Sequence, residues 1–158
     1  MLSVGNKVFL PNYGAGVIDR IEEKKINDEI RVCIGISLLL DSMYLFIPSS
    51  KLADYRIREV LNIDNLLKCL KIIKETPTNI EKKWSKRYRE NNEKISSGDF
   101  NKFCEVLRDL YYLKINGLLP PGEQKILDKT EKMVESEMSL VFNINMEESK
   151  RKLEAFSK

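Results

Sequence analysis

The stretch that decides the fold is NKVFLPNYGAGVIDRIEEKKI, residues 6–26. It opens with a short apolar run that ends at Pro11 and continues with a glycine-rich turn, NYGAG. Residues 16–26 then alternate in polarity and carry β-branched side chains, which is typical of a strand with one buried face. Two strands joined by a glycine-rich turn predict an antiparallel hairpin at the start of the chain.

Two more β-like runs follow this hairpin. IRVCIGISLLL at 30–40 and MYLFIPSS at 43–50 are bounded by the turn sequences NDE and DS. Turns at intervals of about eight to twelve residues predict a small antiparallel barrel or sandwich. Pro48 ends the last run, where a missing backbone N–H does little harm. We therefore expect a small β-domain over residues 1–60.

The period of the apolar residues changes to that of helices after residue 60. DNLLKCLKIIKE at 64–75 has apolar residues three and four apart, with Asp64 or Asn65 as its expected cap. Four more helices are expected to begin at a Thr78–Glu81 capping box, at Asp99, at Pro120–Pro121 and at Asn145. The predicted class is α+β: a small antiparallel barrel at 1–60, then a helical bundle of about five helices at 61–158.

The composition argues against an enzyme. The 158 residues include no histidine, which removes the commonest general base and the commonest metal ligand. Cys33, Cys69 and Cys104 are far apart and are interpreted as small buried hydrophobic residues in a reducing cytosol. No phosphate-binding glycine motif is present. We expect no catalytic residue, cofactor or metal, and the lack of a long apolar run predicts a cytoplasmic protein without membrane contact.

The only tryptophan, Trp84, lies in the charged run EKKWSKRYRENNEK at 81–94. The net charge of +3 comes from residues 60–158, because acidic and basic residues balance over residues 1–59. On a helix Trp84 would share a stripe with Ile80, Tyr88 and Ile95, which favours burial in the core. Its basic neighbours favour display beside nucleic acid, although a charge run can also be a solvated face. The pattern alone leaves both interpretations open.

Five segments resemble the CarD family of transcription regulators. VGNKVFLPNYGAGVIDRIE at 4–22 and FIPSSKLADYRIREV at 46–60 resemble the start and end of the family's N-terminal module. WSKRYRENNEKISSGD at 84–99 is similar to the family signature W-S-x-R-Y-x-x-N-x-x-K, and LRDLYY and GLLPPGEQKIL follow in the family's order. The resemblance extends over nearly the whole chain.

The resemblance implies a bacterial regulator without catalytic activity. Its N-terminal module would be a Tudor-like (SH3-like) barrel that binds the β subunit of RNA polymerase. Its helical module would contact promoter duplex DNA near the upstream edge of the −10 element. There a tryptophan would wedge into the minor groove and stabilise the open complex. The expected partners are RNA polymerase and DNA, with no small-molecule substrate, and we expect a monomer.

The resemblance also favours display of Trp84 and leaves Tyr88 and Ile95 in the core. The residues expected to contact DNA are Trp84, Lys83, Lys86, Arg87, Arg89 and Lys125. Gln124 is neutral where the family often has a basic residue, which weakens the second DNA contact.

The polymerase-binding residues are expected on the short apolar strand at 43–48 and at one basic position that aligns with the family. Four consecutive apolar residues cannot all point inward, and an exposed strand can receive a partner strand. The expected set is Lys24, Tyr44, Leu45, Phe46 and Ile47. An alternative is that Phe46 covers the junction with the helices.

Two other functions remain possible from the sequence. The chain could be a protein–protein adaptor that does not bind DNA. It could also be a general nucleic-acid-binding protein that acts without polymerase. Salt-dependent binding to duplex DNA would exclude the adaptor, and co-purification with polymerase would exclude the general binder.

Overall fold

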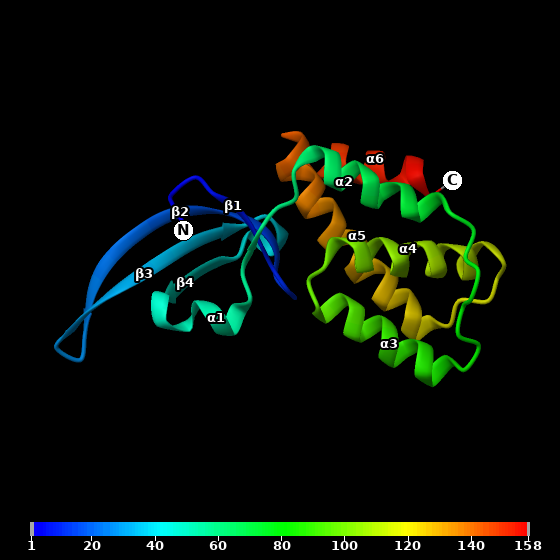
Figure 1. The fold of residues 1–158 in the computed structure, drawn as a ribbon, viewed down its shortest axis with the longest axis horizontal. Helices are drawn as coiled ribbons and strands as arrows, with labels where there is room; N and C mark the ends of the chain where they lie inside the picture. The colour runs from blue at the N-terminus through cyan, green and yellow to red at the C-terminus, as the bar shows by residue number, and fades with distance from the viewer. Residues whose placement is uncertain (1, 158) are drawn as a thin grey trace.

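A computed structural model describes residues 2–157 and places an antiparallel sheet beside a helical bundle (Figure 1). The strands are β1 Lys7–Leu10, β2 Gly14–Ile26, β3 Glu29–Leu38, β4 Tyr44–Pro48 and β5 Arg58–Glu59. Their order in the sheet is β4-β3-β2-β1-β5. The α+β class is confirmed, but the sheet is open and the predicted closed barrel is wrong.

The chain crosses from one edge strand of the sheet to the other in helical form. Residues 49–51 form a 3-10 turn and Leu52–Tyr55 forms the short helix α1, and together they connect β4 to β5 at the opposite edge. Leu52 and Tyr55 pack against the apolar cluster of the sheet. This crossover was not predicted, because its apolar residues are too few to show a helical period.

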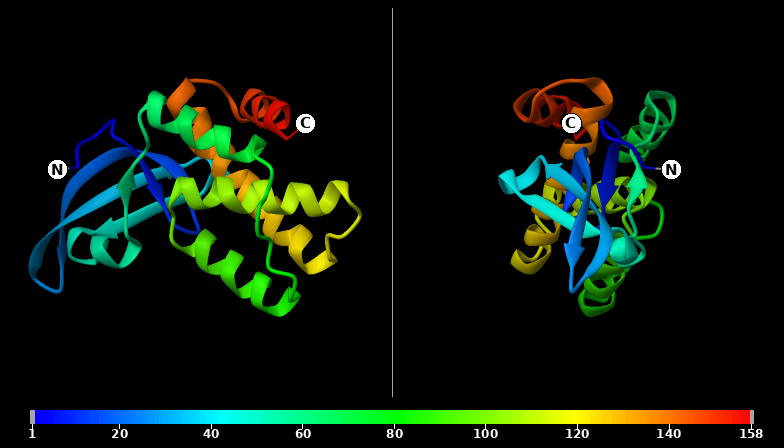
Figure 2. Two further views of the ribbon diagram at one scale, coloured as in Figure 1. Left: turned by 45° about the vertical axis from the view of Figure 1, so that its right-hand side comes forward. Right: turned by 90° about the vertical axis from the view of Figure 1, so that its left-hand side faces the viewer.

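The hairpin of β2 and β3 extends beyond the rest of the sheet (Figure 2). Asn27 and Asp28 form its two-residue turn, with φ of 51° and 63°. Positive φ at both positions gives a turn whose twist matches that of the flanking strands. The predicted NDE turn is therefore confirmed in its position.

The helical part contains the expected five helices. They are α2 Ile63–Leu70, α3 Trp84–Ser96, α4 Phe100–Ile115, α5 Pro121–Phe142 and α6 Met146–Phe156. A 3-10 turn, Lys71–Lys74, extends α2, and another, Leu40–Ser42, precedes β4.

Two of the predicted helix caps are confirmed and two are wrong. Asp99 caps α4 and Asn145 caps α6, each through its side-chain oxygen. α2 is capped by Asn62, whose Oδ1 accepts from the backbone N–H of Asn65 at 2.8 Å, instead of by Asp64 or Asn65. α3 begins only at Trp84, so the Thr78–Glu81 pair is not a capping box.

The sheet is buried on both faces where it meets the helices. Val8 and Leu10 of β1 point into the sheet's own apolar cluster, whereas Phe9 between them points into the core of the bundle. The ring centres of Phe9 and Phe103 are 5.5 Å apart. Ala15, which is paired with Phe9 across the sheet, is buried in the same core. The two halves of the chain therefore share one hydrophobic core.

Polar contacts reinforce this junction along α5. The Lys7 ammonium donates to the backbone carbonyl of Leu140 at 2.8 Å, and the backbone N–H of Ala15 donates to Ser136 Oγ at 3.0 Å. Arg58 on β5 forms two hydrogen bonds to the Glu137 carboxylate, at 2.8 and 2.7 Å. The sheet is thus fixed to one face of α5.

The three cysteines are free thiols, and the predicted burial holds fully for two of them. Cys33 and Cys104 are buried, and Cys69 is partly buried. Burial raises the pKa of the Cys104 thiol, and it raises that of Cys69 as well. A thiol with a raised pKa is a poor nucleophile. Within residues 2–157, no cluster of potential metal ligands is found and no helix is long and apolar enough to cross a membrane.

Candidate nucleic-acid and polymerase interfaces

Trp84 is the first residue of α3 and is 66% exposed. α3 begins at the end of the bundle that is remote from the sheet (Figure 1). The exposure answers the question that the pattern left open, because Trp84 is outside the core. The buried residues of α3 are Arg87, Asn91 and Ile95, which lie within about 60° of Trp84 around the helix axis. Trp84 is therefore exposed because it stands at the start of α3, not because it is on a different face. Ile95 is buried as predicted.

Tyr88 was expected in the core and is instead 43% exposed. Its ring lies against the start of α5, where a Cβ added to Gly122 would be 3.9 Å from Tyr88 Cε2. Trp84 precedes Tyr88 by one turn of α3, and Lys125 follows Gly122 by one turn of α5. Trp84 and Tyr88 therefore lie on one side of α3, beside the start of α5, whereas Lys125 lines a hollow with Asn12 and Asp41.

Basic side chains surround this side of α3. Lys82, Lys83 and Arg89 near Trp84, and Lys125 on α5, are exposed and make no ion pair within 4.0 Å. Lys86 is also exposed but has acidic neighbours, since its Nζ is 3.4 Å from Glu81 and 3.9 Å from Glu90. The charge available to an anionic partner therefore lies chiefly with the first four residues.

Arg87 does not have the position that a phosphate-binding residue requires. Its side chain is buried and donates through Nε and Nη2 to the Glu123 carboxylate, at 2.8 and 2.7 Å. Its Nη1 donates to the backbone carbonyl of Glu81 at 2.9 Å. The expectation that Arg87 contacts DNA is therefore corrected, because its guanidinium is already engaged inside the protein.

Strand β4 forms one edge of the sheet and pairs with β3 alone among the described strands. Leu45 and Ile47 pack on the apolar cluster, and Tyr44 and Phe46 point to the opposite face. The Tyr44 hydroxyl donates to Asp19 Oδ1 at 2.7 Å, and this bond raises the Tyr44 pKa. The prediction that these four side chains cannot all point inward is correct.

Phe46 is held on the surface of the sheet. The Lys24 ammonium lies 4.6 Å from the centre of the Phe46 ring, at a distance typical of a cation–π contact. Phe46 belongs to neither apolar cluster, so the alternative in which it covers the junction with the helices is not supported. The exposed Lys24 and the half-buried Phe46 therefore form one surface feature beside the edge strand.

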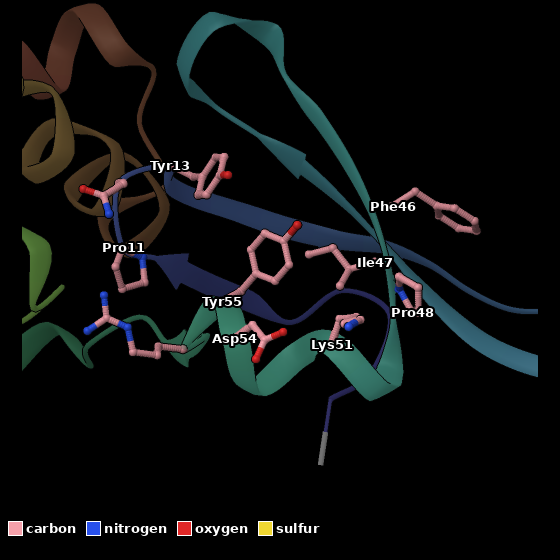
Figure 3. A pocket seen from close by; sticks show the side chains of 10 residues that line it. Pro11, Tyr13, Phe46, Ile47, Pro48, Lys51, Asp54 and Tyr55 are labelled. Atoms are coloured by element: carbon pink, nitrogen blue, oxygen red, sulfur yellow. The ribbon is translucent and has the colours of Figure 1, made fainter.

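A groove of about 490 Å³ lies on the other side of β4. The rings of Tyr13 and Tyr55 line it with their centres 6.0 Å apart. Ile47 points toward these two rings, and Phe46 points away from them (Figure 3). The edge strand is thus flanked by an aromatic groove on one face and by the Lys24–Phe46 pair on the other.

Comparison with known proteins assigns each half of the chain to a known domain family. Residues 2–61 match the CarD-like/TRCF RID domain, and residues 68–154 match the CarD C-terminal domain. The chain belongs to the CarD family. It is 31% identical over 150 residues to a Bacillus subtilis (strain 168) protein named "Putative transcription factor YdeB", with 95% of this chain and 98% of that protein covered. CarD-family proteins are transcription factors and not enzymes, and the RID domain implies binding to RNA polymerase.

The CarD resemblance identified most of the exposed candidate residues but not their surroundings. Tyr88 and the groove at Tyr13 and Tyr55 were missed. Tyr88 was missed because its spacing from Trp84 suggested a buried stripe. The groove was missed because residues 13 and 55 meet only through the fold. The polar Asn91 gives no signal for the exposure of Tyr88, because Asn91 is itself buried.

Proposed function

We propose that this CarD-family protein stabilises the open complex of bacterial RNA polymerase. In this proposal the edge of β4 binds the β subunit, and the face at α3 and α5 binds promoter DNA near the upstream edge of the −10 element. The observation that carries the proposal is the exposed indole of Trp84 at a helix start, beside the unpaired cations Lys82, Lys83 and Arg89. Exposure of a large aromatic side chain among cations suits a nucleic-acid contact.

The DNA contact would combine charge and stacking. Lys82, Lys83, Arg89 and Lys125 would neutralise phosphates and so provide affinity without sequence choice. The Trp84 indole would occupy an unstacked step at the edge of the minor groove. Such a contact favours DNA that is already distorted, as it is at the boundary of the transcription bubble. It therefore suits stabilisation of an open complex better than recognition of a fixed sequence.

The polymerase contact would use the free edge of β4. An edge strand presents unpaired backbone N–H and C=O groups, to which a partner strand can add. Tyr44, Leu45 and Phe46 would contact side chains of the added strand, while the buried Ile47 would hold β4 in place. Lys24 would offer a positive charge to an acidic neighbour. Once held by polymerase, the DNA-binding face needs little affinity of its own, which fits the net charge of only +3.

The test is the lifetime of open complexes formed with the full-length protein. Polymerase, promoter DNA and protein are mixed, a competitor is added, and the decay of the complexes is followed. Trp84→Ala should shorten the lifetime, and Ile63→Ala, at an exposed position of α2, should not. Equal lifetimes for the wild-type protein and Trp84→Ala would contradict the wedge.

A second candidate, a protein–protein adaptor, is favoured by one observation. Tyr112, Ile115 and Leu118 are exposed apolar residues at the same end of the bundle. Tyr112 and Leu118 line a groove of about 520 Å³, together with Ile80 and Lys82. If this surface binds a protein instead of DNA, binding of the full-length protein to duplex DNA will be absent at low salt. Salt-sensitive binding would favour the first proposal.

A further inference from the structure

We propose that Arg87 is a positioning residue that holds the first turn of α3, and with it the indole of Trp84, through an anchor at Glu123. This inference rests on the proposed function of Trp84. It assigns Arg87, a member of a basic run, to the support of the DNA-binding face instead of to the contact itself.

The start of α3 lacks the usual means of fixing a helix end. Lys83 occupies the N-cap position, and its side chain makes no capping hydrogen bond. Uncapped backbone N–H groups leave the first turn of a helix free to fray. Glu81 replaces the cap only in part, because its Oε1 accepts from the backbone N–H of Lys83 at 3.1 Å. A wedge placed on this turn needs another restraint.

Arg87 provides that restraint by joining three segments. Its backbone N–H donates to the carbonyl of Lys83 at 3.0 Å, and its Nη1 donates to the carbonyl of Glu81 at 2.9 Å. Its Nε and Nη2 form the two-bond contact with Glu123 in the first turn of α5. The segment that enters α3, the first turn of α3 and the start of α5 are thus tied through one guanidinium.

The anchor is rigid because it is buried and directional. Arg87 is 8% exposed and Glu123 is 1% exposed. A planar guanidinium that makes two parallel bonds to a carboxylate has a fixed orientation, unlike a lysine ammonium. Trp84 lies three residues before Arg87, on the turn that this contact restrains. An indole that enters a step between nucleobases needs such a rigid support in order not to be displaced.

A buried ion pair can also serve stability alone, and the chain offers a matched control for that possibility. Arg58 and Glu137 form a second, partly buried pair with two hydrogen bonds, and Glu137 lies on α5 as Glu123 does. The two glutamates are separated by about 21 Å along the helix at 1.5 Å per residue. Glu123→Gln and Glu137→Gln therefore make the same chemical change at opposite ends of one helix.

The experiment measures the fluorescence anisotropy decay of Trp84, the only tryptophan, in the free full-length protein. Glu123→Gln should increase the amplitude of the fast decay, whereas Glu137→Gln should leave it as in the wild type. Open-complex lifetime should fall with Glu123→Gln, and Glu123→Gln should have no further effect in a Trp84→Ala background. Non-additivity is expected when one residue acts through another.

A second variant separates positioning from stability. Arg87→Met with Glu123→Leu replaces the ion pair by apolar side chains, a change that often preserves stability. The double variant should unfold near the wild-type midpoint and still show a mobile Trp84, because the bond to the Glu81 carbonyl is lost. Wild-type anisotropy decay in both the Glu123→Gln and the double variant would overturn the inference. If Trp84→Ala leaves the lifetime unchanged, the wedge function fails, and the anisotropy decay still decides the positioning.

Discussion

Arg58 and the buried Glu137 connect the sheet to the bundle through a partly buried ion pair, with both oxygens of the carboxylate bonded to the guanidinium at 2.7 and 2.8 Å. Glu137 Oε2 also accepts from the backbone N–H of Leu61 at 2.8 Å. The guanidinium lies 4.5 Å from the centre of the Phe9 ring and donates to the carbonyl of Gly98. One residue pair thus joins β5, α5, the α3–α4 turn and the shared core.

Arg58→Ala should destabilise the whole protein by about 3–5 kcal/mol, because it leaves the Glu137 charge buried without its partner. Unfolding should remain a single transition, since the halves share a core. Urea denaturation followed by far-UV circular dichroism and by Trp84 fluorescence measures both properties. Lys25→Ala, which removes an exposed pair with Asp28, should change stability by less than about 1 kcal/mol. Two separate transitions in the wild type would contradict the shared core.

Trp84→Ala should change the free energy of unfolding by no more than about 0.5 kcal/mol, because the indole is exposed. The matched change in the core, Phe103→Ala, should cost about 3–5 kcal/mol. Urea midpoints from circular dichroism compare the two variants. A large loss of stability with Trp84→Ala would assign the side chain to packing.

Lys83→Gln with Arg89→Gln should lower the slope of log K against log salt for duplex DNA by about 1 to 2, if each side chain meets a phosphate. Lys68→Gln with Lys71→Gln on the α2 side, which removes the same charge, should leave the slope closer to that of the wild type. Arg87→Gln should affect stability more than the slope, since its guanidinium is bonded to Glu123. Titrations at several salt concentrations provide the slopes.

Lys24→Glu with Phe46→Glu should abolish capture of RNA polymerase by the full-length protein, because it reverses the charge beside β4 and removes the half-buried ring on its surface. The helices should stay folded, since neither residue reaches the shared core. Ile63→Glu with Lys68→Glu on α2 is the matched control. Undiminished capture by the β4 variant would show that polymerase binds elsewhere.

Stability should fall as the pH rises from about 4.5 to about 7, because of Glu135. Burial, with Glu131 and Glu154 nearby, raises the Glu135 pKa from 4.5 to about 7. In this window the folded protein keeps a proton that the unfolded chain has lost, so deprotonation at higher pH disfavours the fold. Glu135→Gln should remove this part of the pH dependence and be relatively more stable at pH 8. Urea midpoints of both proteins at several pH values test the difference.

Local patterns predicted the strands, the helices and the exposure of the basic run, because period and turn chemistry are properties of neighbouring residues. They failed where a partner is distant in sequence. Arg87 meets Glu123 across 36 residues, and nothing in the local run separates it from Arg89. The burial of Glu123 and Glu137 on α5 was likewise not foreseen, because each is paired with an arginine that only the fold brings close. The helix α1 was missed as well, because its four residues are too few to show a helical period.

The core that the sheet and the bundle share has a geometric consequence for the proposed contacts, one with polymerase at β4 and one with DNA at Trp84. With the sheet fixed to α5, the span from β4 to Trp84 is set by the fold and not by a linker. On polymerase-bound DNA, moving the bubble edge by one base pair shifts it by about 3.4 Å and turns it by roughly a tenth of a helical revolution. In the proposed function, the rigid molecule would therefore fix the distance between the polymerase contact and the DNA contact. It would favour complexes in which the upstream edge of the bubble lies at the matching distance. Promoters can vary this distance without any change in the bases that the protein contacts.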